Sequence, residues 1–164
     1  MANKLKDEIQ QNKPFAGLEQ EALLNIRRTS GHVEHITQQI FKAQGLTDSQ
    51  YNVLRILRGA GPGGLRCTEI GERMITRDPD ITRLLSRLQR RRLIGRHRDT
   101  RDRRVIHIRI TAAGGAVLRE LDPVVEASAL TTLGHLTRDK LALLIDLLEE
   151  VRTGLCGQTT AETR

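Results

Sequence analysis

Apolar residues recur at helical spacing over most of the chain and alternate with polar residues over one short stretch. Between residues 18 and 43 the apolar positions stand three, four or seven residues apart, which predicts a long helix: Leu23, Ile26, Val33, Ile36 and Ile40. Gly45 should end that helix. Thr47 can cap a second one with Tyr51, Leu54 and Leu57 on one face, and the glycine-rich stretch GAGPGG, residues 59–64, should end it in a loop.

The strongest helical pattern lies in the middle of the chain. A short helix is expected first, from a cap at Thr68 through Met74. The next helix has apolar positions at i, i+3, i+4 and i+7, namely Ile81, Leu84, Leu85 and Leu88. Asp78 is the expected N-cap of this helix, with Pro79 in its first position, where the missing N–H has no partner to lose.

From residue 105 the period changes to two, which predicts a β-strand. One side of this strand carries Ile106, Ile108 and Ile110, and the other side carries Val105, His107 and Arg109. Leu93 and Ile94 can begin a partner strand, so a hairpin is expected with its tip at residues 99–103.

Helical spacing returns after the hairpin. A helix should begin at Ala112, and Asp122–Pro123 should kink it or make it restart. Thr137 can cap a last helix with an unusually wide apolar face, which needs more than one neighbour to cover it: Leu141, Leu143, Leu144, Ile145, Leu147, Leu148 and Val151. We expect residues 1–17 to form an arm and residues 154–164 a disordered tail.

Positive charge is concentrated in one part of the chain. The net charge is +7, and residues 66–109 alone contain 14 Arg and no Lys against 6 Asp or Glu, a local balance of +8. One segment therefore carries the whole positive field, which indicates a polyanionic partner bound at one place. The planar fork of arginine matches phosphate and guanine edges.

Other classes of protein find little support in the sequence. Cys67 and Cys156 are far apart, so neither a disulfide framework nor a zinc site is expected, and they read as free thiols in a reducing compartment. His32 and His35 lack a third ligand, so no metal site is expected. GAGPGG lacks the Gly-Lys-Ser/Thr of a phosphate loop. We expect a cytoplasmic, soluble protein with no enzymatic activity, no cofactor and no membrane segment.

The order of short helix, helix and hairpin predicts a winged helix-turn-helix. On a helix advancing about 100 degrees per residue, the polar residues of the helix at 81–90 lie opposite its leucines. An arginine-rich face would also fit a solvated surface, but its position just before an arginine-rich hairpin favours DNA binding. The candidate recognition residues are Arg77, Thr82, Arg83, Ser86, Arg87 and Arg90. Arg91 and Arg92 should touch phosphates or solvent.

Four stretches together resemble the MarR family of transcriptional regulators: LTDSQYNVLRIL (46–57), CTEIGERM (67–74), ITRLLSRLQRRRLIGR (81–96) and DRRVIHIRITAAG (102–114). The most specific feature is an Asp-x-Arg wing motif nine residues before a Thr, here Asp102, Arg104 and Thr111. The resemblance implies that Arg104 enters the minor groove and that Asp102 holds the wing. The candidate wing residues are Arg98, Arg101, Asp102, Arg103 and Arg104. Arg92 departs from the family, which usually has Gly there.

The resemblance implies a mainly α fold with a small β-hairpin wing, that is, a winged helix-turn-helix with N- and C-terminal dimerisation helices. We assign residues 18–45 and 112–153 to dimerisation and residues 46–111 to DNA binding. The implied function is a homodimeric regulator, in most such proteins a repressor, that binds a pseudo-palindromic operator on double-stranded DNA.

The resemblance also implies control by a small molecule of phenolic type, bound between the dimerisation helices and the winged domain. No residue of the sequence identifies this effector, although Tyr51, Val33 and His32 could line such a cleft. Two alternatives stay open. One is a constitutive architectural or RNA-binding module that uses the same basic face, and the other is a thiol-based redox sensor acting through Cys67.

Overall fold

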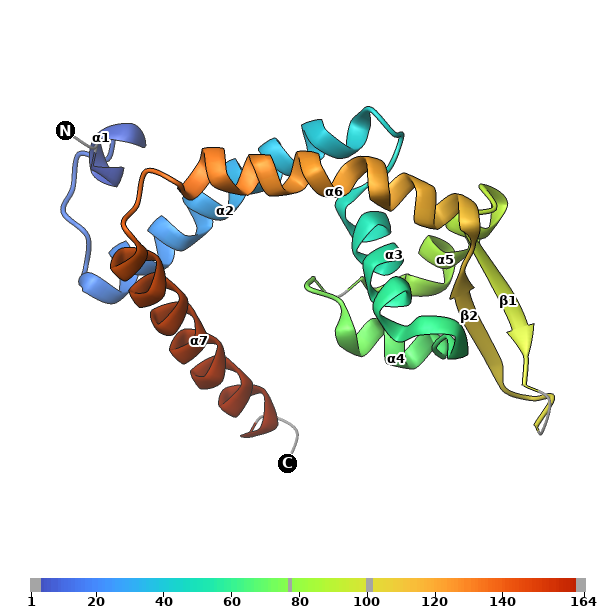
Figure 1. Ribbon diagram of the computed structural model, residues 1–164. Helices are drawn as coiled ribbons and strands as arrows, with labels where there is room; N and C mark the ends of the chain where they lie inside the picture. The colour runs from blue at the N-terminus through green and yellow to red at the C-terminus, as the bar shows by residue number, and fades with distance from the viewer. Residues whose placement is uncertain (1–3, 77, 100–101, 162–164) are drawn as a thin grey trace. The chain divides into compact units, whose positions relative to one another are not determined.

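The computed structural model describes residues 4–76, 78–99 and 102–161, with side chains up to residue 155. Its helices are α1 (Leu5–Glu8), α2 (Leu18–Lys42), α3 (Asp48–Ala60), the 3-10 turn η1 (Gly61–Gly63), α4 (Cys67–Arg73), α5 (Ile81–Arg90), α6 (Ala112–Leu133) and α7 (Arg138–Ala161), and its strands are β1 (Ile94–Arg98) and β2 (Ile106–Ile110) (Figure 1). This mainly helical fold with a two-stranded hairpin is the fold class that the sequence predicts. The chain divides into two compact units, Met1–Val125 and Glu126–Arg164.

The first unit is built around a core that α3, α5 and the hairpin share. Leu54 and Leu57 of α3 and Leu88 of α5 are 0% exposed, and Ile108 of β2 is 3% exposed. The ring of Tyr51 stacks on that of Phe41 with a centroid distance of 4.5 Å, which joins α3 to the end of α2. Burying these side chains fixes α5 against α3 and leaves the opposite face of α5 free.

The N-terminal cap of α3 is the residue that the sequence predicted, whereas the caps of α4 and α5 are different residues from those predicted. Thr47 Oγ1 accepts from the Gln50 N–H at 3.3 Å, and Gln50 Oε1 accepts from the Thr47 N–H at 3.1 Å, a reciprocal capping box. The prediction of a cap at Thr68 is wrong, because α4 already begins at Cys67 and its first turn is closed by Glu69. The Glu69 carboxylate accepts from the Arg66 N–H at 2.7 Å.

The predicted cap of α5 at Asp78 is also wrong, by two residues. Asp80 is the N-cap, and its carboxylate accepts from the Arg83 N–H at 3.1 Å. Asp78 instead accepts from the Asp80 N–H at 2.9 Å, so it closes the turn that leads into the helix, and Pro79 lies in that turn. Two eligible aspartates flank the proline, and the sequence does not distinguish their roles.

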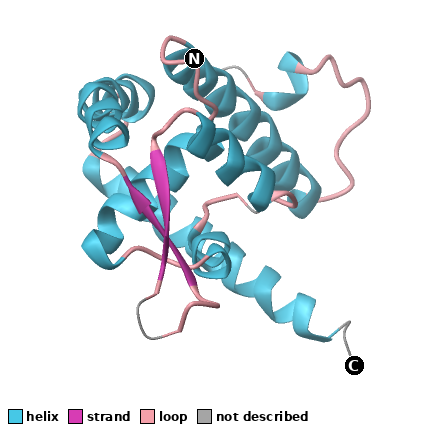
Figure 2. Ribbon diagram, turned by 90° about the vertical axis from the view of Figure 1, so that its right-hand side faces the viewer, coloured by secondary structure: helices cyan, strands magenta, loops and turns pink. Residues whose placement is uncertain are grey.

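The hairpin is antiparallel, with Ile94 opposite Ile110 and His97 opposite His107, and its two magenta strands cross in Figure 2. Its base is anchored to the chain before α4, because Leu65 and Ile108 exchange backbone hydrogen bonds of 3.0 and 2.8 Å. The approach requires glycine at residue 64, where φ is +72° and a Cβ would lie 2.5 Å from the Ile108 carbonyl oxygen. The base of the wing is therefore held rigidly against the core.

The two C-terminal helices differ from expectation. Helix α6 runs continuously through Pro123, so the helix does not restart there. Helix α7 continues to Ala161, so the prediction of a disordered tail from residue 154 is wrong up to that residue. Gly154 lies inside α7, since a glycine costs a helix only about 1 kcal/mol and no proline follows to stop it. Among the described residues, no helix has the length and apolarity needed to cross a membrane.

Candidate nucleic-acid interface

Helix α5 has one buried face and one exposed, basic face. Leu84, Leu85 and Leu88 are 6%, 1% and 0% exposed. The opposite face carries the candidate recognition residues, of which Thr82, Arg83, Arg87 and Arg90 are exposed and Ser86 is half-buried. The Ser86 hydroxyl donates to the Thr82 carbonyl at 2.8 Å. Arg77, the remaining candidate, lies outside the described residues. The face that the helical spacing predicted is thus present, with three guanidinium groups open to solvent.

The connection from α4 to α5 is held by a residue that the sequence analysis missed. Asn52 lies on α3, is 7% exposed, and accepts from the Ile75 N–H at 3.0 Å through its side-chain oxygen. A buried amide placed in this way satisfies its own polar group and fixes the start of the connection. The available signal was an Asn between the apolar residues of α3, but nothing in the sequence named its partner.

Arg91 has a structural partner and does not share the free face of α5. Its guanidinium donates to the carbonyl oxygens of Gly45 and Gln44 at 2.7 and 2.8 Å, in the turn between α2 and α3. The side chain is exposed, in agreement with the predicted contact with solvent, and these two hydrogen bonds fix its guanidinium in place. The partner carbonyls lie 46 and 47 residues away along the chain, so no local pattern could indicate them.

Two carboxylates, those of Asp99 and Asp102, accept backbone hydrogen bonds in the described part of the wing. Asp99 Oδ1 accepts from the Asp102 N–H at 3.1 Å, and Asp102 Oδ1 accepts from the Arg104 N–H at 2.9 Å. The Val105 N–H donates to the Asp102 carbonyl at 2.9 Å and completes the turn. Asp102 is therefore placed to hold the backbone at Arg104, whose side chain is exposed together with those of Arg98 and Arg103. Arg101 lies outside the described residues.

The two histidines of the hairpin differ in exposure, because His107 is half-buried and His97 is not. His107 lies opposite His97, and its Nε2 is 3.4 Å from Asp99 Oδ2. Its Nδ1 is buried and has no hydrogen-bond partner among the described residues. His107 thus packs against the wing's own turn, while His97 is exposed.

The three residues suggested for an effector cleft separate in the structure. Tyr51 is 5% exposed and belongs to the core. His32 borders a small groove on α2 together with Arg27, Arg28 and Gly31. Val33 lines a larger cavity of about 720 Å³ beside the turn from α2 to α3. Sequence spacing alone could not separate them, because all three lie on helices with mixed polar and apolar faces.

Cys67 is the first residue of α4 and is half-buried. In the part of the chain that the structure describes, no three His, Cys, Asp or Glu side chains gather closely enough to hold a metal ion.

The profile described as MarR family matches residues 46–106, which span α3, the basic helix and most of the hairpin. The chain is similar to the HTH-type transcriptional repressor YetL of Bacillus subtilis, with 30% identity over 103 residues, 63% of this chain and 62% of YetL. The chain thus spans about three fifths of the length of that curated relative.

Two solved structures extend the similarity over nearly their whole length. A MarR transcription factor from Planctomyces limnophilus has 40% identity and a TM-score of 0.64, over 83% of this chain and 98% of that one. BpsR of Bordetella bronchiseptica, whose DNA binding is regulated by 6-hydroxynicotinic acid, has 26% identity and a TM-score of 0.73, over 85% of this chain and 98% of its own.

Proposed function

Because the chain belongs to the MarR family of winged helix-turn-helix transcriptional regulators, we propose that it binds double-stranded DNA at a specific operator and represses transcription from it. One observation carries the proposal: α5 buries its leucines and exposes three arginines and a threonine on the other face, directly before a basic wing. Arginine can bond two edges of guanine at once, and a hydroxyl can bond a base or a phosphate. This surface suits reading bases in the major groove. A DNA partner also implies that the protein works in the cytoplasm.

The wing supplies the second contact. Arg104 is exposed at a turn that Asp102 fixes by a 2.9 Å hydrogen bond, which supports insertion of Arg104 into a narrow minor groove beside the operator. Arg98 and Arg103 would contact phosphates on either side. Contacts of this kind make affinity strongly dependent on salt, with a loss of roughly a thousandfold between 50 and 200 mM if six or more phosphates are neutralised.

The working form is a homodimer. Helix α7 exposes a row of apolar side chains within its own unit, namely Leu143, Ile145, Leu147, Val151 and Leu155. Helix α2 exposes another within the first unit, namely Leu18, Leu23, Ile26 and Ile36. Apolar faces this long are typical of a surface that another protein covers. A second copy of the chain would place two α5 helices on half-sites about 34 Å apart, one turn of B-DNA.

Footprinting on the DNA upstream of the protein's own gene tests the proposal. We expect protection of a pseudo-palindrome whose half-sites are one helical turn apart. Protection spread evenly over the fragment would favour an architectural protein instead, and preferential binding of structured RNA would favour an RNA-binding module. Small-molecule control, as described for BpsR, is part of the proposal.

A further inference from the structure

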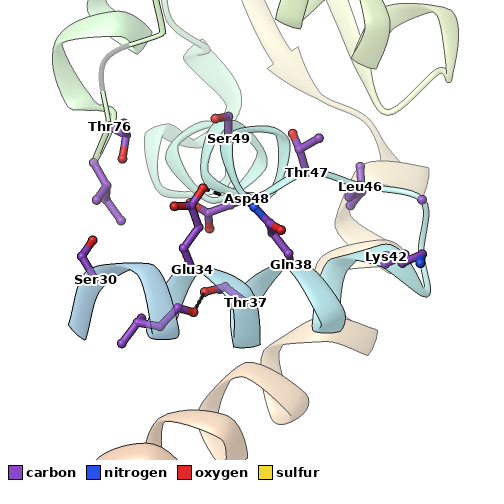
Figure 3. A pocket seen from close by; sticks show the side chains of 13 residues that line it. Ser30, Glu34, Thr37, Gln38, Lys42, Leu46, Thr47, Asp48, Ser49 and Thr76 are labelled. Atoms are coloured by element: carbon purple, nitrogen blue, oxygen red, sulfur yellow. Dashed lines mark hydrogen bonds between the residues drawn. The ribbon is translucent and has the colours of Figure 1, made fainter. Parts of the chain in front are cut away.

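The larger cavity of the first unit is enclosed by three parts of the chain. One wall is the second half of α2, another is the turn into α3 with the first residues of that helix, and the third is the connection after α4 at Ile75 and Thr76. Its volume is about 720 Å³, which is in the range of small-molecule sites. Figure 3 shows Glu34 and Gln38 rising from α2 toward Asp48 at the start of α3.

The polar wall of this cavity is acidic. Burial, and then the nearby Glu34 carboxylate, raise the pKa of Asp48 above its ordinary value. Gln38 donates to Glu34 at 3.2 Å, but among the described side chains neither Glu34 nor Asp48 forms an ion pair. Lys42 is the one described lysine that lines the cavity, and it stands at the far end of the α2 segment in Figure 3. Two carboxylates that repel each other in a recess favour a positive charge between them.

The other wall is apolar and unusually exposed. Val33 is 44% exposed and Ile75 is 78% exposed, although both line a concave surface. Ile75 is held there by the hydrogen bond from its N–H to the buried Asn52. An apolar group seated against these two side chains would remove their surface from water, at roughly 25 cal/mol per Å².

The geometry points to an amphipathic organic cation as the occupant of this cavity, with its ammonium group between Glu34 and Asp48 and its apolar body against Val33 and Ile75. This inference rests on the proposed function, because it assigns the effector site of a DNA-binding regulator. It replaces the phenolic effector that the resemblance implied. A phenolic acid would bring a third negative charge to the acidic wall, which costs binding energy.

The cavity also contacts the part of the chain that positions the recognition helix. Ile75 and Thr76 lie between α4 and α5, and α5 begins six residues after Ile75. A ligand pressed between α2 and this connection favours one arrangement of the connection over others. The free energy of DNA binding can therefore change by as much as the ligand's binding free energy differs between the two arrangements. By the same linkage, DNA binding changes the free energy of ligand binding by an equal amount.

Calorimetry on the full chain without DNA tests the site itself. The probes are 4-phenylbutylammonium and 4-phenylbutyrate, which share an apolar body and differ in the sign of their charge. We expect the cation to bind and the anion to bind at least about tenfold more weakly. Equal or tighter binding of the anion, or no heat from the cation at millimolar concentration, would overturn the inference.

Substitutions locate the charge that the cation meets. Glu34→Gln and Asp48→Asn should each weaken cation binding, by about five- to tenfold for the partly buried Asp48 and less for the exposed Glu34, since each removes one attractive charge. Glu19→Gln is the matched control, because Glu19 is an exposed carboxylate of the same helix outside the cavity. A loss of the same size in Glu19→Gln would mean that the general field of α2, not the cavity, attracts the cation.

Fluorescence anisotropy with operator DNA tests the regulatory part. Saturating cation should shift the DNA affinity of the unmodified chain and leave that of the double variant Glu34→Gln, Asp48→Asn unshifted. A cation that binds in calorimetry but leaves operator affinity unchanged would overturn the regulatory role. If the chain without the cation bound no DNA, the result would contradict the proposed function and not the cavity. Calorimetry would still show whether the cation binds in the cavity.

Discussion

Arg58 donates to both carboxylate oxygens of Asp122, 64 residues further along the chain, and so ties α3 to the first half of α6. The hydroxyl of Tyr51 donates to the same carboxylate at 3.4 Å. The hydrogen bonds from Arg58 keep the pKa of Asp122 below its ordinary value, although partial burial of the carboxylate opposes this shift. Asp122 lies near the end of the first unit, next to Pro123, where the helix lacks one backbone donor.

Replacement of Asp122 by Asn should lower the free energy of unfolding at neutral pH by about 1 kcal/mol, because the charge of a two-pronged ion pair is lost. The carboxylate stabilises the fold only when ionised, and its folded pKa lies below the unfolded one. The difference in the free energy of unfolding between parent and variant should therefore have its full size at pH values above the ordinary aspartate pKa. It should disappear as the pH falls through the lower pKa of Asp122 in the folded protein.

Urea unfolding at a series of pH values between 7 and 2 measures this difference. Asp146→Asn, which removes an exposed carboxylate from α7, serves as the matched control for the loss of one negative charge. If the parent and Asp122→Asn stay equally far apart down to the lowest pH, ionisation of Asp122 is not the source of the stability.

Arg92 adopts a left-handed conformation, with φ of 58°, just after the end of α5. Its N–H donates to the Gln89 carbonyl at 2.9 Å, and its carbonyl accepts from the Thr111 hydroxyl at 2.8 Å, so the conformation is fixed. Arg92→Gly should raise the free energy of unfolding by about 0.5–1 kcal/mol, because glycine adopts this conformation without steric cost. Arg92→Ala, which removes the same side chain but keeps the strain, should give no gain in urea unfolding. A gain in both variants would show that the side chain itself was unfavourable.

Arg87 and Arg91 lie four residues apart and should respond in opposite ways. Arg87→Ala should relax base preference at one operator position, at a cost of about 1–3 kcal/mol in binding, with stability unchanged. Arg91→Ala should lower stability by about 1–2 kcal/mol, since the Gly45 and Gln44 carbonyls lose their donors, and should leave operator affinity of the folded protein unchanged. Thermal unfolding and selection from a randomised operator library measure the two effects. An unaltered base preference in Arg87→Ala would remove that residue from the readout.

Arg104→Ala should weaken operator binding by about tenfold when an A·T-rich flank is present, and much less when that flank is G·C-rich. Arg119→Ala, an exposed arginine on α6, is the control and should bind as the parent does. Sedimentation should give the same oligomeric state for all three proteins. Full affinity of Arg104→Ala on the A·T-rich operator would contradict the wing assignment.

The periodic elements of the fold could be predicted from the sequence because their causes are local. The leucines of α5 at i, i+1 and i+4 define its buried face without reference to any partner, and that fixes the exposed positions of Arg83 and Arg87. The alternation around Ile108 similarly predicted the strand and its inner side. The same local reasoning placed the cap of α5 at Asp78, because the choice between Asp78 and Asp80 depends on how the preceding turn folds.

The parts that could not be predicted depend on contacts distant in sequence. The carbonyls that accept from Arg91, and the Ile75 N–H that donates to Asn52, become partners only when α2, α3 and the α4–α5 connection come together. The acidic cavity has the same origin, since Glu34 and Asp48 lie on separate helices and Ile75 reaches them from a third segment. The resemblance to a family therefore implied an effector, but the sequence did not identify the residues that line this cavity.

Competition binding tests the central claim, sequence-specific recognition of DNA, most directly. A labelled fragment from upstream of the protein's own gene is bound by the full chain and challenged with excess random duplex, or with structured RNA, at physiological salt. We expect binding to survive both competitors, since specific sites are typically bound at least about a thousandfold more tightly than random DNA. Displacement of the labelled fragment by an equal mass of random DNA or of RNA would contradict it.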